Sequence, residues 1–154
     1  MNGGNIALNG LLGFLGGLNM TGGSGNDITL TVGNSLDIDG DGRYCAATDG
    51  LRISRYLNNV TGPALTTGAL APATPSGTAT RTSDTDIFNY LTFIRSTLNV
   101  KGSGTPDSTD SLLKRRYLFG FRGAALVAGV TPPGGVTISA FAASVQANIA
   151  ALTP

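Results

Sequence analysis

The sequence predicts a mainly α-helical protein made of two loop-helix repeats with extra helices, preceded by an arm with one or two β-strands. Three observations support this prediction. The pattern D-x-L-x-x-x-R-Y-L-x-x-x-x-G-x-A-L-x-x-G begins at Asp49 and recurs 61 residues later at Asp110. Apolar residues recur at helical spacing in both halves of the chain. Residues 28–32, by contrast, alternate between apolar and polar side chains, which is typical of a strand.

The repeat also divides the chain. We expect a strand-forming arm at residues 1–35 and a helical domain at residues 36–154, with repeat one at 36–98 and repeat two at 99–154. At 154 residues the chain is long enough to bury a core without disulfides. Its single cysteine, Cys45, is interpreted as a small, partly buried residue.

The arm contains one clear strand candidate and one weaker one. Ile28, Leu30 and Val32 alternate with threonines, and Ile6–Leu8 is the weaker candidate. A lone strand leaves backbone groups unpaired, so its partner is either the preceding segment, folded back as a hairpin, or another chain. The arm also carries an apolar face that includes Leu11 and nothing obvious covers it. Ile28, Leu30 and Val32 are therefore candidate assembly residues.

Four core helices follow from apolar spacing and from candidate N-cap residues. The expected N-caps are Thr48, Ser83, Thr109 and Ser139. The apolar stripes behind them are Ile53, Tyr56, Leu57 and Val60; Ile87, Tyr90, Leu91, Ile94 and Leu98; Leu113, Tyr117 and Leu118; and Phe141, Val145, Ile149 and Leu152. Residues 61–82 between the first two helices are rich in Thr, Ala, Pro and Gly, which predicts an extended surface connection.

Composition excludes several classes of function. The chain has no His, no Glu and no Trp, which rules out a Ser-His-Asp triad and His-containing zinc sites. We therefore expect no enzyme activity. A net charge of +1 provides no field for nucleic acid, and the basic run Lys114, Arg115, Arg116 is interpreted as a solvated helix face. No apolar run is long enough to span a bilayer, so no membrane insertion is expected.

The acidic loop before the first helix has the spacing of a calcium site. Asp37, Asp39 and Asp41 alternate and are followed by a glycine, which permits the sharp turn of a loop wrapped around an ion. The backbone carbonyl of Arg43 and the carboxylate of Asp49 complete the candidate ligand set. Ca²⁺ suits this many oxygen ligands better than Mg²⁺ does. The alternative is an Asp/Gly-rich turn that caps a helix and binds nothing.

These residues carry a family resemblance. D-I-D-G-D-G, a further Asp and L-x-x-x-R-Y-L, with a second copy after a linker, resemble the type I dockerin repeat, an EF-hand-like calcium loop followed by a helix. Gly120-Phe121-Arg122-Gly123 resembles a variant found in large bacterial surface and secreted proteins. The resemblance implies two dockerin-like repeats that bind calcium. It also implies a cohesin-like partner.

The second loop departs from the dockerin pattern. Its candidate ligands are Asn99, Ser103, Thr105, Asp107 and Asp110. Lys101, however, occupies the third position of the loop, where the first loop has Asp39. Two alternatives remain open for this loop: a second calcium site, or a metal-free turn in which the lysine ammonium stands in for the ion.

Together these features predict a non-enzymatic, calcium-stabilised structural module that self-assembles, into a filament or surface layer, through its arm. The alternative is a dockerin-type adaptor that binds a cohesin-like partner and tethers an enzyme or surface protein. Two N-x-T triplets, at Asn19 and Asn59, are candidate glycosylation sites and fit an extracellular or cell-surface location. A homo-oligomer or polymer is the expected state under the first interpretation.

Overall fold

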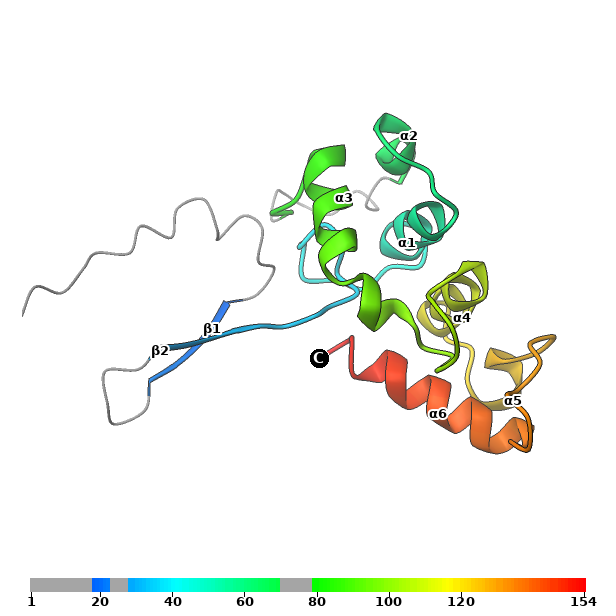
Figure 1. The fold of residues 1–154 in the computed structure, drawn as a ribbon. Coiled ribbons are helices and arrows are strands. Elements are labelled where there is room, and N and C mark those ends of the chain that lie inside the picture. Colours follow the sequence, from blue (N-terminus) through cyan, green and yellow to red (C-terminus); the bar gives the residue numbers. More distant parts are fainter. Residues whose placement is uncertain (1–17, 23–27, 70–78) are drawn as a thin grey trace, which may run out of the picture.

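The computed structural model describes residues 18–22, 28–69 and 79–154, and this part of the chain is mainly helical (Figure 1). The elements, in order, are β1 (Leu18–Gly22), β2 (Ile28–Val32), α1 (Asp49–Leu57), α2 (Pro63–Thr66), α3 (Asp84–Phe93), the 3₁₀-helix η1 (Arg95–Leu98), α4 (Ser108–Leu118), α5 (Gly123–Leu126) and α6 (Ile138–Ala150). None of the helices in the described ranges is long and apolar enough to cross a membrane.

The two strands pair with each other. β1 and β2 run antiparallel, with Leu18 opposite Val32 and Gly22 opposite Ile28. The side chains of both strands, including those of the predicted assembly residues Ile28, Leu30 and Val32, lie outside the described part of the structure. The weaker strand candidate at residues 6–8 lies outside it as well.

Helices α1, α3, α4 and α6 supply most of the core, as the apolar stripes predicted. Each of these helices turns at least one buried apolar side chain inward, among them Ile53, Leu91, Leu113 and Val145. Tyr117, which the spacing also placed in the core, is only partly buried and packs against it. The four predicted core helices are therefore present.

Two predicted helix starts are wrong. α4 begins at Ser108 instead of after Thr109, because the Asp107 carboxylate accepts hydrogen bonds from the N–H groups of Thr109 and Asp110. α6 begins at Ile138 after Thr137, whose hydroxyl accepts from Ala140 N–H at 3.2 Å. In both cases an acceptor nearer the N-terminus than the predicted cap satisfies the first free donors.

The connection at residues 61–82 is not wholly extended, because it contains the single-turn helix α2. A proline occupies the first position of this helix, where its missing N–H costs no hydrogen bond. Gly62, just before it, has φ of 60°, a conformation that favours glycine. Residues 70–78 of this connection lie outside the described structure.

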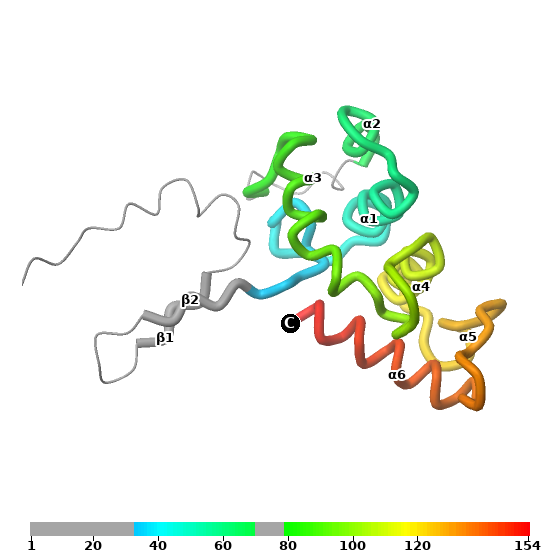
Figure 2. The backbone as a smooth tube through the Cα atoms, viewed as in Figure 1, coloured from blue at the N-terminus to red at the C-terminus, as the bar shows by residue number. Residues whose placement is uncertain are grey.

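The two repeats meet where α1 and α4 lie side by side (Figure 2). A Cβ atom at Gly50 of α1 would lie 2.9 Å from Cγ of Arg115 in α4. The hydroxyl of Ser111 in α4 contacts that of Ser54 in α1 at 3.4 Å. Adding the repeat offset of 61 converts Gly50 into Ser111 and Ser54 into Arg115, so each of these close approaches is the repeat-related copy of the other, as a pseudo-twofold relation between the repeats requires.

The arginine of the repeated R-Y-L motif, Arg55 in the first repeat and Arg116 in the second, makes equivalent hydrogen bonds in both repeats. Arg55 Nη1 donates to the carbonyl oxygens of Leu65 at 3.2 Å and Thr67 at 2.7 Å. Arg116 Nη1 makes the same pair of contacts 61 residues later, to Leu126 at 3.2 Å and Ala128 at 2.7 Å. These bonds tie the single-turn helices α2 and α5 to the helices before them, which explains why R-Y-L and G-x-A-L recur together.

The beginning and the end of the helical domain are joined. Leu36 N–H donates to the carbonyl oxygen of Leu152 at 2.8 Å, and the Tyr44 hydroxyl donates to the carbonyl oxygen of Pro154 at 3.0 Å. Leu36 is fully buried and belongs to the core cluster. The acidic loop that follows it is therefore anchored on the core at its first residue.

Candidate metal centre

The first loop is wound around the carboxylate of Asp37. Asp37 Oδ1 accepts hydrogen bonds from the N–H groups of Gly40 at 2.7 Å and Asp41 at 3.1 Å, and Oδ2 accepts from Gly42 N–H at 2.8 Å. Gly42 has φ of 82°, so the expected role of this glycine in a sharp turn is confirmed. Gly40 also has a positive φ, and a side chain there would collide with the hydroxyl of Thr80.

Three carboxylates converge at this loop. One oxygen from each of Asp37, Asp39 and Asp49 lies within 4.8 Å of the others, and no other group of three or more acidic or cysteine side chains in the described residues is arranged to hold a metal. Asp49 comes from the first residue of α1, and its oxygens accept from Ile38 N–H at 2.8 Å and Cys45 N–H at 2.9 Å. Asp49, at the start of α1, thus holds the beginning of the loop at Ile38 and its later part at Cys45 close to the cluster.

Asp39 provides the observation that points to a ligand. Its Oδ2 pairs with Nη1 of Arg52 at 2.5 Å, whereas its Oδ1 is buried and has no hydrogen-bond partner. The Asp39 side chain is only 5% exposed. A buried acceptor without a donor costs about 1–3 kcal/mol, so this oxygen is a position where a cation would be stabilising.

The electrostatics of the cluster are unbalanced without an ion. Burial raises the pKa of Asp37, and the charge of Asp39 adds to this increase while backbone N–H groups oppose it. Burial likewise raises the pKa of Asp49 from 3.8 to about 6, again with repulsion from Asp39 and Asp37. Carboxylates that resist ionisation in this way are stabilised in their charged form by a bound cation.

Two buried arginines support the loop, and neither was identified as part of the site from the sequence. Arg52 of α1 also donates from Nη2 to the carbonyl oxygen of Ala69 at 2.9 Å, which holds its guanidinium beside Asp39. Arg81 donates from Nε to Ile38 O at 2.7 Å and from Nη2 to Asp37 O at 2.6 Å. Arg81 therefore fixes the loop backbone and leaves the carboxylates available.

The structure brings together three of the five predicted ligands. Asp37, Asp39 and Asp49 form the cluster, whereas Asp41 accepts a hydrogen bond from Arg43 N–H at 2.9 Å and is not in the group. Ligation by Asp41 and by the carbonyl of Arg43 stays a prediction. All donors in the cluster are carboxylate oxygens, the ligands that Ca²⁺ and Mg²⁺ prefer, and such a cluster could hold a metal ion.

The second loop has the same backbone framework. Gly102 and Gly104 have φ of 77° and 64°, like the paired glycines of the first loop. Asn99 takes the place of Asp37, with Oδ1 accepting from Gly102 N–H at 3.1 Å and Nδ2 donating to Gly104 O at 2.8 Å. Asp110, at the start of α4, accepts from Val100 N–H at 2.9 Å, as Asp49 does from Ile38 N–H.

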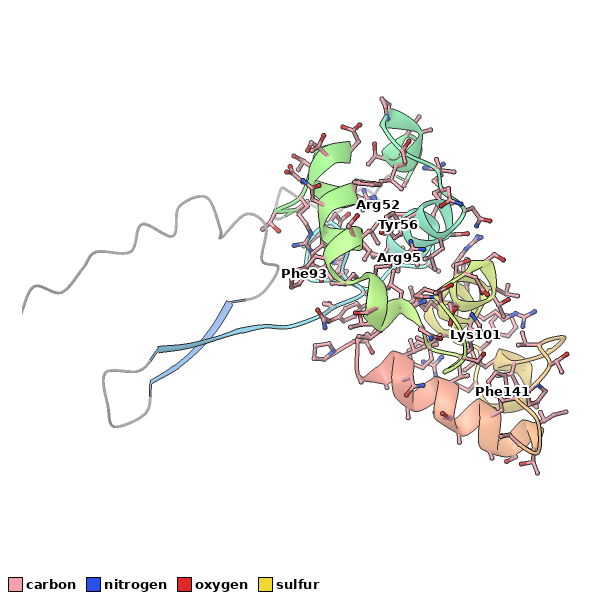
Figure 3. The ribbon with its side chains drawn as sticks, in the orientation of Figure 1. Arg52, Tyr56, Phe93, Arg95, Lys101 and Phe141 are labelled. Carbon is pink, nitrogen blue, oxygen red and sulfur yellow. The ribbon has the colours of Figure 1, made fainter. Side chains whose placement is uncertain are left out.

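The interior of this second loop differs in its charge, because the ammonium of Lys101, a residue labelled beside α4 in Figure 3, is bonded to oxygens of the loop. Its Nζ lies 2.6 Å from Asp110 Oδ2, 2.8 Å from Asp107 Oδ2 and 3.1 Å from Thr105 O. Burial alone works to lower the pKa of Lys101, but the hydrogen bonds to Asp107 and Asp110 outweigh it and raise that pKa. The predicted ligand Ser103 is exposed and is not among these contacts.

The prediction for the basic run was wrong at Lys114. This side chain is fully buried and its ammonium donates to the carbonyl oxygens of Leu98 at 2.5 Å and Asp110 at 3.2 Å. The repeat contained a signal for this burial, because subtracting 61 places Lys114 opposite Ile53, which is a core residue of α1.

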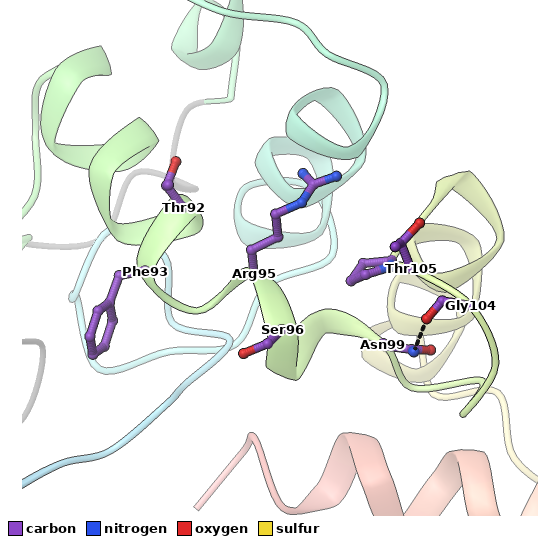
Figure 4. A pocket seen from close by; sticks show the side chains of 8 residues that line it. Thr92, Phe93, Arg95, Ser96, Asn99, Gly104 and Thr105 are labelled. Carbon is purple, nitrogen blue, oxygen red and sulfur yellow. Dashed lines mark hydrogen bonds between the residues drawn. The ribbon is translucent and has the colours of Figure 1, made fainter.

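A groove of about 490 Å³ lies beside the second loop, between that loop and the end of α3 (Figure 4). Its lining includes Phe93, Arg95, Asn99 and Thr105, and it contains no carboxylate among the described residues. The groove is therefore separate from the acidic cluster and is not suited to a metal ion.

The candidate glycosylation sites remain predictions. Asn59 is exposed in the turn after α1, with φ of 62°. Asn19 lies in β1, and its side chain is outside the described structure.

Comparison of the chain with protein family models, with curated proteins and with solved structures found no match in any of the three.

Proposed function

We propose that the chain is a non-enzymatic structural module that binds one calcium ion in its first loop and assembles with further copies through its N-terminal arm. The observation that carries the calcium part is the cluster of Asp37, Asp39 and Asp49 with the buried, unpartnered oxygen of Asp39. Three carboxylates in this cluster face the guanidinium of Arg52, and the loop's second guanidinium, that of Arg81, is bonded to backbone carbonyl oxygens, so negative charge remains for a divalent cation to neutralise.

In this proposal the ion stabilises the fold. The cluster joins the loop, through Asp37 and Asp39, to the first residue of α1, and α1 forms the centre of the pseudo-twofold packing. An ion that binds the folded loop and not the unfolded chain stabilises the whole domain. Ca²⁺ suits the site better than Mg²⁺, because a loop of carboxylates and carbonyls supplies more oxygens than a partly hydrated octahedral ion uses.

The assembly part rests on the arm. Ile28, Leu30 and Val32 alternate with threonines in β2, and residues 1–26 contain no charged side chain. A two-stranded hairpin leaves two edges able to add a further strand, and an uncharged edge offers little to prevent such pairing. Addition of the arm to a neighbouring copy would produce a filament or layer at the cell surface, provided that the contact is head to tail.

Calcium will raise the melting temperature of the chain, and the increase will be larger at pH 7 than at pH 5. The pKa of Asp49 is raised from 3.8 to about 6 in the folded, metal-free protein, so the folded state holds this proton more tightly than the unfolded chain. Metal-free stability therefore falls as the pH rises from about 4 to about 6, and a proton competes with the ion below pH 6. At 100 times the dissociation constant, the ion adds about 2.7 kcal/mol, or roughly 10 °C.

Thermal melts with calcium and with chelator at both pH values measure this difference. Asp37→Asn, which removes a charge from the cluster, will lose most of the calcium effect. The matched control is Asp84→Asn, which removes a carboxylate of α3 outside the cluster and will keep the effect. A wild-type chain with equal melting temperatures in calcium and chelator contradicts the calcium part of the proposal.

The full chain will form oligomers that grow with concentration, and charging the strand will abolish them. Leu30→Lys combined with Val32→Lys places charges on β2 and disfavours strand addition. Sedimentation velocity of the full chain and of this variant, with electron microscopy of the sedimented fraction, measures the assembly. A control variant with lysines at the exposed positions Thr85 and Asn89 of α3 will assemble like the wild type.

A wild-type chain that stays monomeric at all concentrations contradicts assembly through the arm. That result favours the dockerin-type adaptor, which has one supporting observation of its own. Leu112, Phe119 and Phe121, in and just after α4, are 42%, 60% and 47% exposed, and they would be available to a cohesin-like partner.

A further inference from the structure

We infer that the ammonium of Lys101 is the built-in cation of the second loop, so that this loop closes without metal and lysine replaces a second ion. The inference concerns repeat two alone. Only the statement that the chain binds one ion in total rests on the proposed function.

The ammonium occupies the position at which an ion would be held. Lys101 Nζ contacts Thr105 O, Asp107 Oδ2 and Asp110 Oδ2, which are three of the oxygens expected to bind calcium in this loop. These distances of 3.1, 2.8 and 2.6 Å are those of charge-assisted hydrogen bonds. The lysine side chain is 14% exposed, so it is enclosed by the loop and does not lie over its surface.

The two loops differ in the number of acceptors that lack a donor. In the second loop every carboxylate oxygen of Asp110 and Asp107 has a donor. Asp110 Oδ1 accepts from the N–H groups of Val100 and Lys101, and Asp110 Oδ2 accepts from Lys101 Nζ and Asp107 N–H. Asp107 Oδ1 accepts from the N–H groups of Thr109 and Asp110, and Asp107 Oδ2 pairs with Lys101 Nζ. In the first loop, Asp39 Oδ1 is buried and has none. A divalent ion would fill an empty position in the first loop, but in the second it would have to displace an ammonium.

The balance of charge leads to the same conclusion. The first loop sets three clustered carboxylates against two guanidiniums, that of Arg52, which pairs with Asp39, and that of Arg81, which donates to the carbonyl oxygens of Asp37 and Ile38. The second sets the carboxylates of Asp107 and Asp110 against the ammonium of Lys101, and Asn99 replaces the first acid. The buried ammonium of Lys114 is also bound to Asp110 O, on the same residue. The second loop therefore attracts a further cation much less than the first.

The difference between the two loops arises at one loop position. Lys101 stands where the first loop has Asp39, and Asp107 and Asp110 correspond to Cys45 and Asp49. A long side chain at this position, directed inward, carries its charge to the centre of the loop. Changing Lys101 to aspartate restores the acid that the first loop has at this position and removes the competing ammonium, so a single substitution will open a cation site in repeat two.

Calorimetric titration of the full chain with CaCl₂, after removal of metal with chelator, tests the inference. We expect one ion per wild-type chain and two per Lys101→Asp chain. Lys101→Met removes the ammonium without adding a ligand, and it will bind no second ion at micromolar calcium and will melt at a lower temperature in chelator. Circular dichroism shows whether each variant is folded. If the Lys101→Asp chain is not folded, Lys101→Asn replaces it in the titration, because asparagine adds an oxygen ligand without a negative charge.

Two results overturn the inference: a wild-type chain that binds two ions, or a folded Lys101→Asp chain that binds no more ions than the wild type. The first result leaves calcium binding by the first loop standing and contradicts only the total of one ion per chain. Conversely, a wild-type chain that binds no ion and a Lys101→Asp chain that binds one would contradict the calcium part of the proposed function and support the inference. NMR of the lysine side-chain ammonium in the wild type gives a second measurement, because displacement of Lys101 by calcium would shift its resonance.

Discussion

Replacing Asp39 with alanine will lower the free energy of unfolding by about 3–5 kcal/mol in the absence of calcium, the range measured when one partner of a buried ion pair is removed. The side chains of Asp39 and Arg52 are 5% and 11% exposed, so alanine leaves a guanidinium that is buried and has lost its counter-charge. The bond from Arg52 to Ala69 O remains, and it holds the arginine in place. Urea denaturation with chelator present measures this loss.

A double-mutant cycle distinguishes the ion pair from a general effect of truncation. Arg52→Met removes the charge and keeps most of the apolar stem, and we expect Asp39→Ala combined with Arg52→Met to be less destabilised than Asp39→Ala alone. Calcium will not rescue Asp39→Ala, because the unpartnered oxygen is absent. A loss below about 1 kcal/mol in chelator, the level of an exposed ion pair, would show that the pair does not contribute as a buried one.

Replacing Lys114 with methionine will stabilise the domain at pH 6, and the gain will disappear as the pH approaches 10. Lys114 is fully buried, and burial lowers its pKa from 10.5 to about 7, although the charge of Asp110 opposes this decrease. An unfolded lysine has a pKa of about 10.4, so between pH 7 and pH 10 the unfolded chain holds more protons than the folded one. Wild-type stability therefore rises with pH through this window, and methionine removes that dependence.

The size of the gain depends on two opposing contributions. Charging a buried ammonium at pH 6 costs several kcal/mol, but methionine leaves the carbonyl oxygens of Leu98 and Asp110 without this donor. We expect a net increase on the order of 2 kcal/mol in the free energy of unfolding at pH 6. Arg115→Met, at the neighbouring half-buried position, is the control and will not change the pH dependence. A variant that is less stable than wild type at pH 6 contradicts this account of Lys114.

Local patterns predicted the frame of the site. The alternating aspartates, the glycine at the turn and the acid that opens the helix are encoded within thirteen residues, and the structure places Asp37, Asp39 and Asp49 together. The repeat offset and the helical spacing predicted the four main helices for the same reason, because each depends on neighbours along the chain. Boundaries were less accurate where two acceptors near a helix start compete for the same donors, as at Asp107 and Thr109.

Contacts between distant segments could not be predicted in this way. Arg81, near the end of the connection at residues 61–82, donates to Asp37 O and Ile38 O, and no spacing rule connects it to the loop. Arg52 lies outside the apolar stripe predicted for its helix, yet it is buried against Asp39. Both residues balance charge within the fold, and that balance is a property of tertiary packing.

The junction between the two ends of the domain has a mechanical consequence. Leu36 N–H is bonded to Leu152 O, and Tyr44 is bonded to Pro154 O, so the arm leaves the domain beside the place where the last helix finishes. Tension applied between the arm and the C-terminal end of α6 would act first on this junction. Helices α1 and α4 would remain unloaded until the junction separates, and a chain held at both ends would yield there before its core is disturbed.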